Sequence, residues 1–172
     1  MKKSYEERAK VFIRRICKMA SENHIQFATR GSLRVLTNFF NNSGRQKIRI
    51  MSGCARTALI TSDYVVKIDT GIKDYGTCID EVEVYDYAVQ CGVERILAKP
   101  TPYTYNDIDF YIYPRVDYVG RYYRGKDFWD CISCAEDDFL TRHIDDLHNA
   151  NIGFYKNGEP VVLDYASTFD LS

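Results

Sequence analysis

Carboxylate and amide side chains flank a predicted β-hairpin near the end of the sequence. Two short apolar runs, 152–155 and 161–163, are separated by an Asn-Gly pair, the strongest short-range signal for a hairpin. Because a hairpin brings its two ends together, we expect Asn151 and Asp164 to be neighbours, with Asp146 shortly upstream. Two carboxylates and an amide oxygen suit Mg²⁺, which commonly takes phosphate oxygens as further ligands. Taken singly, each of these residues is also typical of an ordinary turn.

A lysine and a glutamate lie within apolar patterns, where a charge is costly. Lys67 belongs to the strand pattern 64–68, and a lone lysine in a strand usually faces solvent, so an exposed and a buried Lys67 are about equally favoured here. Residues 78–91 have a helical pattern in which Glu81 shares the apolar face, whereas Glu83 falls on the exposed face. A carboxylate on a packed face needs a cation, and Lys67 is a candidate.

The spacing of apolar residues changes along the chain from a helical to a strand pattern, and this change predicts the elements that would position these residues. Ser4 to Glu7 fits a capping box that starts a helix, and a second helix is expected from Ser32. Strands are then predicted near 48–51, 57–61, 64–68 and 110–113, with helices over 78–91 and 128–144 before the hairpin. This order predicts an α+β fold with an antiparallel sheet.

Length and composition narrow the class of protein. A chain of 172 residues with 45% hydrophobic and 27% charged residues is typical of a folded domain. Its net charge of -1 argues against nucleic acid as a partner. No apolar run suits a membrane span, and a charged segment, 5–8, follows the basic start in place of an apolar signal segment. We therefore expect a cytoplasmic protein without a membrane partner.

The six cysteines are expected to be reduced thiols. Cys131 and Cys134 precede His143 and His148, but their central gap differs from the usual zinc-finger spacing. Both cysteines also fall within a helical pattern. Structural thiols are the favoured interpretation, and a zinc site is the alternative.

The candidate residues together resemble the protein-kinase-like fold in a shortened form. Asp146-Leu147-His148 and Asn151 match the catalytic-loop pattern Asp-Leu-x-x-x-Asn, and Asp164 stands where the Asp-Phe-Gly motif belongs. Val65-Val66-Lys67-Ile68 resembles the third-strand Val-Ala-Ile-Lys, with Glu81 as its helix partner. The chain is similar to small bacteriophage-encoded protein kinases of the T7-like early type, which would place it in the cytoplasm of a host cell.

The resemblance implies a domain organisation. It covers about residues 46–168. Residues 46–116 would form a lobe with an antiparallel sheet and a helix, and residues 117–172 a truncated helical lobe with the catalytic-loop hairpin. Residues 1–45 would be a helical extension packed on the domain, with a dimer contact as the alternative.

The resemblance also implies a role for each candidate residue. Asp146 would accept or orient the proton of the attacking hydroxyl, and Lys67, partnered by Glu81, would contact the α- and β-phosphates of ATP. Asn151 and Asp164 would hold Mg²⁺.

Three further residues are implied as nucleotide contacts. Gly53 lies in the segment 52–58, at the place of the glycine-rich loop. Tyr113 and Val116 lie where the hinge that binds adenine would fall.

The sequence departs from the family pattern at several places. Segment 52–58 carries one glycine where the pattern has three, and Ile144 replaces the histidine before the catalytic aspartate. Tyr165 replaces the phenylalanine after Asp164. The sequence ends at Ser172, so an activation segment and a helical platform for a peptide substrate are not expected.

Two functional hypotheses follow from different classes. The first is a minimal Mg²⁺- and ATP-dependent kinase that phosphorylates a host protein or itself on Ser, Thr or Tyr, as a host-takeover factor. The second is an inactive kinase-like protein that binds a nucleotide or a protein partner as an inhibitor. A small-molecule phosphotransferase is a third, less favoured class, since it also needs a helical substrate lobe.

The first predicted helix carries a basic face. It consists of four cations: Lys10, Arg14, Arg15 and Lys18. A solvated surface is the simplest interpretation, and an acidic partner is the alternative.

Overall fold

The structure is a computed structural model that describes residues 3–25, 30–42, 47–53, 55–70, 77–145 and 147–165. The chain divides into two compact units, the first comprising Met1–Tyr75 with Thr101–Arg115, and the second Gly76–Pro100 with Val116–Ser172. Helices and an antiparallel sheet of five strands make this an α+β protein, as the sequence predicts. No helix in the described part of the chain is long and apolar enough to cross a membrane.

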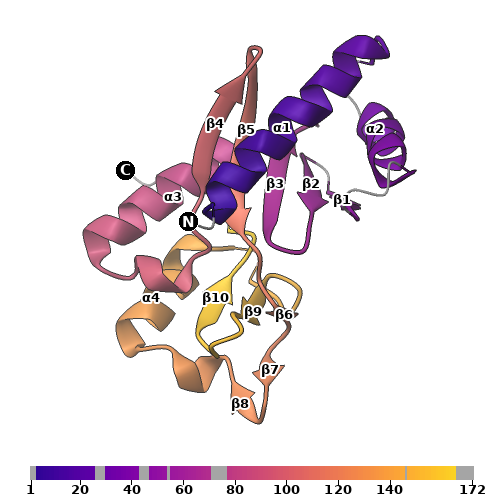
Figure 1. Ribbon diagram of the computed structural model, residues 1–172. Coiled ribbons are helices and arrows are strands. Elements are labelled where there is room, and N and C mark those ends of the chain that lie inside the picture. The colour runs from indigo at the N-terminus through magenta and orange to yellow at the C-terminus, as the bar shows by residue number, and fades with distance from the viewer. Residues whose placement is uncertain are drawn as a thin grey trace. The chain divides into compact units, whose positions relative to one another are not determined.

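The first unit contains the five-stranded sheet (Figure 1). Its strands are β1 (Arg49–Ser52), β2 (Arg56–Ile60), β3 (Tyr64–Asp69), β4 (Thr101–Tyr105) and β5 (Ile108–Pro114). They pair antiparallel in the order β1-β2-β3-β5-β4, so β3 lies at the centre and β4 at an edge.

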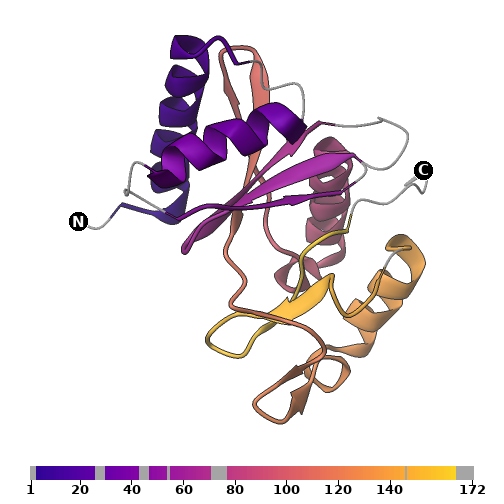
Figure 2. The ribbon, with the colours of Figure 1, turned by 90° about the vertical axis from the view of Figure 1, so that its right-hand side faces the viewer.

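Two helices, α1 (Tyr5–Glu22) and α2 (Arg30–Asn42), pack against one face of this sheet (Figure 2). The predicted capping box of α1 is confirmed, because Ser4 Oγ accepts a hydrogen bond from Glu7 N at 3.2 Å while the Glu7 carboxylate accepts one from Ser4 N at 3.2 Å. Apolar side chains of both helices and of β2, β3 and β5 form one buried cluster, which includes Phe12, Leu36, Leu59, Val66 and Phe110.

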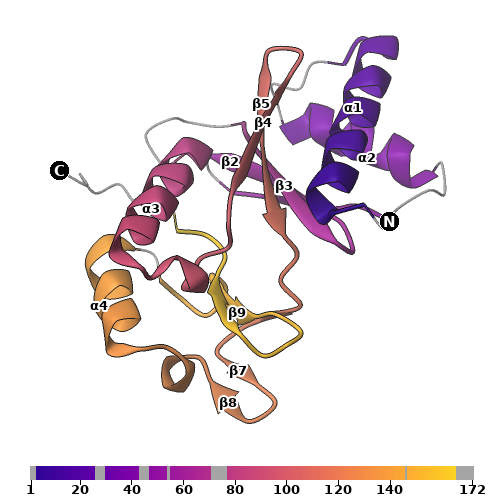
Figure 3. The same cartoon turned by 60° about the vertical axis from the view of Figure 1, so that its left-hand side comes forward.

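The second unit combines two helices with short strands (Figure 3). Its elements are α3 (Cys78–Cys91), the 3-10 helices η1 (Glu94–Ile96) and η2 (Trp129–Cys131), β6 (Tyr118–Val119), β7 (Tyr122–Tyr123), β8 (Lys126–Asp127), α4 (Cys134–His143), β9 (Ile152–Phe154) and β10 (Pro160–Val162). The Tyr87 ring on α3 lies 6.0 Å from that of Phe139 and 5.1 Å from that of His143 on α4. Strands pair as β10-β9-β6 and as β7-β8.

Several element predictions differ from the structure, and α2 starts at Arg30 rather than at Ser32. The helix predicted over 128–144 is wrong in its first part, because Ser133 Oγ caps Glu136 N at 3.3 Å and α4 starts only at Cys134. The strand β4 was not predicted, since its Pro102 is unfavourable in a central strand. A proline is tolerated here because β4 is an edge strand.

Candidate functional site

The predicted hairpin is confirmed, and its open end carries the candidate metal ligands. Strands β9 and β10 pair antiparallel with Ile152 opposite Val162. The ladder continues one step further, because Leu163 N donates a hydrogen bond to Asn151 O at 2.8 Å. Asp164 follows Leu163 directly, so its backbone starts beside that of Asn151.

Tyr165 anchors the other side of Asp164. The Tyr165 N–H donates to Glu81 Oε1 at 3.4 Å, which is a long hydrogen bond, and its phenol donates to Ala98 O at 2.6 Å. The Tyr165 side chain is 1% exposed. Burial raises the pKa of this phenol well above its usual value, and the Glu81 carboxylate adds to the effect. The hydroxyl therefore stays neutral and available as a donor.

Glu81 is a buried carboxylate on α3. Its side chain is 0% exposed and lies on the same helix face as Val84 and Ala88, while Glu83 is exposed, as predicted. Val89, near the end of the same helix, is 49% exposed. A fully buried carboxylate is expensive unless it accepts hydrogen bonds or pairs with a cation. The contact with Tyr165 supplies one such bond.

Lys67 is a buried cation at the centre of the sheet in the first unit. On β3 it lies between Ala58 of β2 and Tyr111 of β5, and it is 9% exposed. Its neighbours Val66 and Ile68 belong to the apolar cluster under the helices, so Lys67 projects from the opposite face of the sheet. Its ammonium lies 4.6 Å from the centroid of the Tyr113 ring, a cation–π contact.

The predicted nucleotide contacts fall on three different elements. Gly53 lies in the β1–β2 turn, where its N–H donates to Arg56 O at 2.9 Å. Tyr113 lies on β5 and is 2% exposed, and Val116, which follows β5 and begins the second chain segment of the second unit, is 3% exposed. The structure thus gives the two hinge positions buried side chains.

The structure also shows a row of hydroxyls that was not singled out from the sequence. Thr57 Oγ1 lies 3.2 Å from Ser52 Oγ and 2.7 Å from Thr70 Oγ1. Ser52 and Thr57 face each other at the end of the β1–β2 pair, next to Gly53. The register of the β1–β2 pair would predict the contact of Ser52 with Thr57. The contact of Thr57 with Thr70 could not be predicted in this way, because Thr70 follows the end of β3.

Asp146 lies outside the described residues, so its role rests on the resemblance alone. Among residues 3–25, 30–42, 47–53, 55–70, 77–145 and 147–165, no three His, Cys, Asp or Glu side chains converge in a way that could hold a metal ion. The cysteine and histidine residues of the alternative zinc site make contacts other than with a common metal position. Cys134 is exposed, His143 packs on Tyr87 and Phe139, and His148 Nδ1 accepts from Ala150 N at 3.1 Å.

No family model, curated protein or solved structure matches this chain. The chemistry open to this protein therefore follows from the geometry of its described residues. The first feature is the pair of Asn151 and Asp164 at the open end of the hairpin. The second is the buried carboxylate of Glu81, which accepts a hydrogen bond from Tyr165 N, and the third is the buried ammonium of Lys67 on the central strand β3.

Proposed function

We propose that this protein is a minimal Mg²⁺- and ATP-dependent protein kinase that transfers phosphate to Ser, Thr or Tyr, on another protein or on itself. One observation carries the proposal: Asp164 is held between two anchored neighbours. Leu163 N–H is bound to Asn151 O at 2.8 Å and Tyr165 N–H to Glu81 Oε1 at 3.4 Å. A metal ligand in a catalytic site needs this kind of support from the residues around it.

The order of the residues along the chain supports the proposal. In kinases the phosphate-binding lysine lies on the third strand, its glutamate on the helix that follows, and the metal ligands near the catalytic loop and the Asp-Phe-Gly motif. Here Lys67 lies on β3, Glu81 on α3, and Asn151 and Asp164 on either side of the β9–β10 hairpin. Burial of both Lys67 and Glu81 also favours a role for each, since burying a charge costs free energy.

The donor set fits Mg²⁺ rather than a metal held by protein alone. Mg²⁺ binds through one or two carboxylates and completes its shell with water and substrate phosphates. Asn151 and Asp164 offer one amide and one carboxylate oxygen, so a second acidic ligand is not required. The ion would neutralise charge on the β- and γ-phosphates.

The remaining residues would position the reacting groups. The substrate hydroxyl oxygen forms a bond to the γ-phosphorus while the bond from that phosphorus to the β–γ bridging oxygen breaks, and ADP leaves with the electron pair. The hydroxyl proton passes to Asp146, as the resemblance implies, and the Lys67 ammonium stabilises the phosphates. Most of the rate gain would come from positioning and charge stabilisation.

A labelling assay tests this function. The purified chain is incubated with Mg²⁺ and γ-labelled ATP, with and without a bacterial lysate. We expect label on protein, and a loss of about a hundredfold or more in Asp164→Asn and Lys67→Met. The matched controls Asp130→Asn and Lys99→Met remove exposed charges of the same kind and should keep full labelling. Equal labelling in all variants would point to a contaminating kinase and refute the proposal.

The second candidate is an inactive kinase-like binding protein. The observation that favours it is an exposed apolar surface on β6 and β7, where Tyr118, Val119 and Tyr122 are 45%, 57% and 69% exposed. A melting temperature raised by Mg²⁺ and ATP without any labelling would select a nucleotide-binding protein. Glu81→Gln should then abolish the shift, while Glu83→Gln, on the exposed face of the same helix, should keep it.

A further inference from the structure

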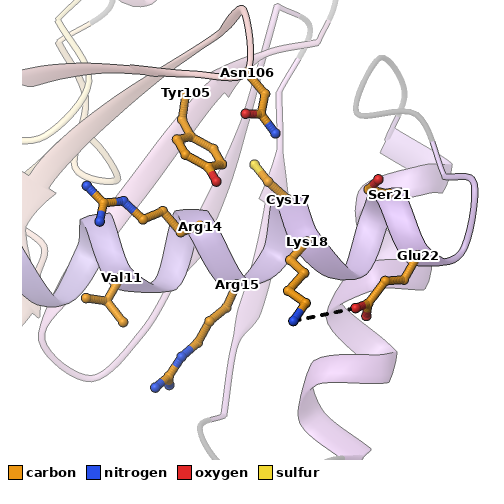
Figure 4. Close-up of a pocket in the computed structure, with 9 residues that line it drawn as sticks. All are labelled: Val11, Arg14, Arg15, Cys17, Lys18, Ser21, Glu22, Tyr105 and Asn106. Carbon is orange, nitrogen blue, oxygen red and sulfur yellow. Dashed lines mark ion pairs between the residues drawn. The ribbon is translucent and has the colours of Figure 1, made fainter.

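A basic groove runs between α1 and the tip of the β4–β5 hairpin, within the first unit (Figure 4). Its volume is about 530 Å³. The charged side chains that line it are Arg14, Arg15, Lys18 and Glu22. Tyr105 and Asn106 of the hairpin form the opposite side. This surface plays no part in the function proposed above.

The groove has an excess of positive charge. Three cations line it against one carboxylate, and Glu22 is paired with Lys18 at 3.7 Å. Lys10 adds a fourth cation beside it, 5.5 Å from the centroid of the Tyr103 ring. Burial raises the pKa of the Cys17 thiol to about 11, so the groove gains no negative charge from it near neutral pH. Because the whole chain carries a net charge of -1, this is a local concentration of cations.

The arginine geometry is partly fixed before any ligand binds. Arg14 Nε donates to the Tyr103 hydroxyl at 3.0 Å, which holds the guanidinium at the mouth of the groove. Thr104 and Asp109 hydrogen-bond to each other at 2.7 Å, and alternation along β4 places this pair on the face of the sheet away from Tyr103. The β4–β5 hairpin therefore keeps the carboxylate of Asp109, on β5, off the face that carries Tyr103.

We propose that this groove binds an acidic peptide segment of a protein partner. Guanidinium groups form paired hydrogen bonds with carboxylates, and the lining residues Arg14 and Arg15 offer two such groups, which Figure 4 shows directed to different sides of α1. Val11 adds an apolar contact for the stems of the bound Asp and Glu side chains. Arginine and tyrosine are also the residue types that contribute most binding energy at protein interfaces.

The aromatic side chains favour a peptide over single-stranded nucleic acid. Nucleic-acid grooves use exposed rings as stacking platforms for bases. Here the Tyr103 and Tyr105 rings stack on each other, 6.3 Å apart and 12° from parallel, and both pack against the apolar cluster. Tyr105 lines the groove, and Tyr103 stacks on it with Lys10 over its own ring, so these rings do not form a free platform.

Fluorescence anisotropy with a dye-labelled peptide of alternating Glu and Ser tests the inference. We expect binding that weakens as salt is added, and a loss of about tenfold or more in Arg14→Glu/Arg15→Glu. The control Arg34→Glu/Arg49→Glu changes the net charge equally at exposed positions outside the groove and should bind normally. If the first variant fails to fold by circular dichroism, Arg15→Ala/Lys18→Ala replaces it, with the same direction expected.

Several outcomes would overturn the inference. Equal losses of peptide affinity in the groove variant and in the control would mean that the net charge of the protein, and not the groove, determines binding. If the peptide does not bind even at low salt, the groove is not a binding site for acidic peptides. If an oligothymidine of equal length binds more tightly than the peptide, the groove is a nucleic-acid site. Peptide binding and phosphate labelling are separate readouts, so failure of one leaves the other proposal standing.

Discussion

The two units of this protein hold their buried side chains by different means. The first unit has a single apolar cluster that joins two helices to a sheet with strands of four to seven residues. The second unit has strands of only two or three residues, and it combines buried apolar side chains, such as Phe128, Leu140 and Phe154, with buried polar contacts. There Glu136, 3% exposed, pairs with Arg95 at 2.6 Å and accepts from Ser133 N at 2.6 Å.

Apolar burial contributes mainly to the stability of a unit, whereas buried polar contacts mainly fix the positions of particular side chains. Apolar burial is roughly proportional to area and does not fix any single atom in place. A buried polar contact is directional, and breaking one partner leaves the other unsatisfied. The second unit uses such contacts at Tyr165 and Glu81, next to the candidate metal ligand Asp164. In the first unit the charged candidate, Lys67, lies on the sheet face away from the apolar cluster.

The largest expected effect is a cavity in the first unit. Phe12 is 2% exposed, and its ring lies 5.3 Å from that of Phe40 and 6.0 Å from that of Tyr64. Phe12→Ala should lower the free energy of unfolding by about 3–5 kcal/mol. Urea unfolding followed by far-ultraviolet circular dichroism measures this, and Phe39→Ala, at a position 50% exposed, should change stability by about 0.5 kcal/mol or less. Similar losses of unfolding free energy in the two variants would mean that the apolar cluster is not the main source of stability in this unit.

A smaller effect is expected from a methyl group added to the second unit. A Cβ atom at Gly153 would overlap the carbonyl oxygen of Tyr118 and meet Val116 Cγ1 at 3.0 Å. Gly153→Ala should therefore cost about 1–3 kcal/mol, because β6 must move away from β9. The fluorescence of Trp129, the one tryptophan in the sequence, reports unfolding of this unit.

Gly53→Ala, in the first unit, is the control for a methyl group added without overlap, and far-ultraviolet circular dichroism compares its stability with that of Gly153→Ala. Among the described residues, the new Cβ at Gly53 would meet only Arg56 O, at 3.8 Å, which is ordinary contact. A loss in the Gly53 variant as large as in the Gly153 variant would mean that the tight approach of β6 and β9 is not what limits stability.

Local signals in the sequence were enough to predict much of the fold. The Asn157-Gly158 pair predicted the β9–β10 hairpin, and Gly158 does adopt the positive φ of 89° that such a turn needs. The period of residues 78–91 predicted α3 with both ends correct and Glu81 on its buried face. These features depend on residues a few positions apart.

Contacts between distant residues could not be predicted in the same way. Nothing near Tyr165 indicates that its hydroxyl would reach Ala98, or that its N–H would reach the carboxylate of Glu81. The sequence left the orientation of Lys67 undecided, because alternation gives two faces to a strand but does not say which face is covered. The strands β6, β7 and β8 have two residues each, which is too short for a period to be recognised.

The smallest effect concerns the polar anchor beside Asp164. Tyr165→Phe keeps the ring and removes the hydroxyl that donates to Ala98 O at 2.6 Å. It should cost about 1–2 kcal/mol at neutral pH, since a buried carbonyl loses its partner. Tyr122→Phe, at a side chain 69% exposed, should be neutral within about 0.5 kcal/mol.

The pH dependence distinguishes this anchor from simple packing. Burial raises the pKa of Tyr165 in the folded state above the unfolded value of about 10, so its contribution is fully present below that pH and is lost as pH rises toward the folded-state pKa. The difference in unfolding free energy between the unmodified chain and Tyr165→Phe should therefore shrink above about pH 10. A gap that stays constant across this range would show that the hydroxyl acts through shape, and the polar anchor would then no longer distinguish the second unit from the first.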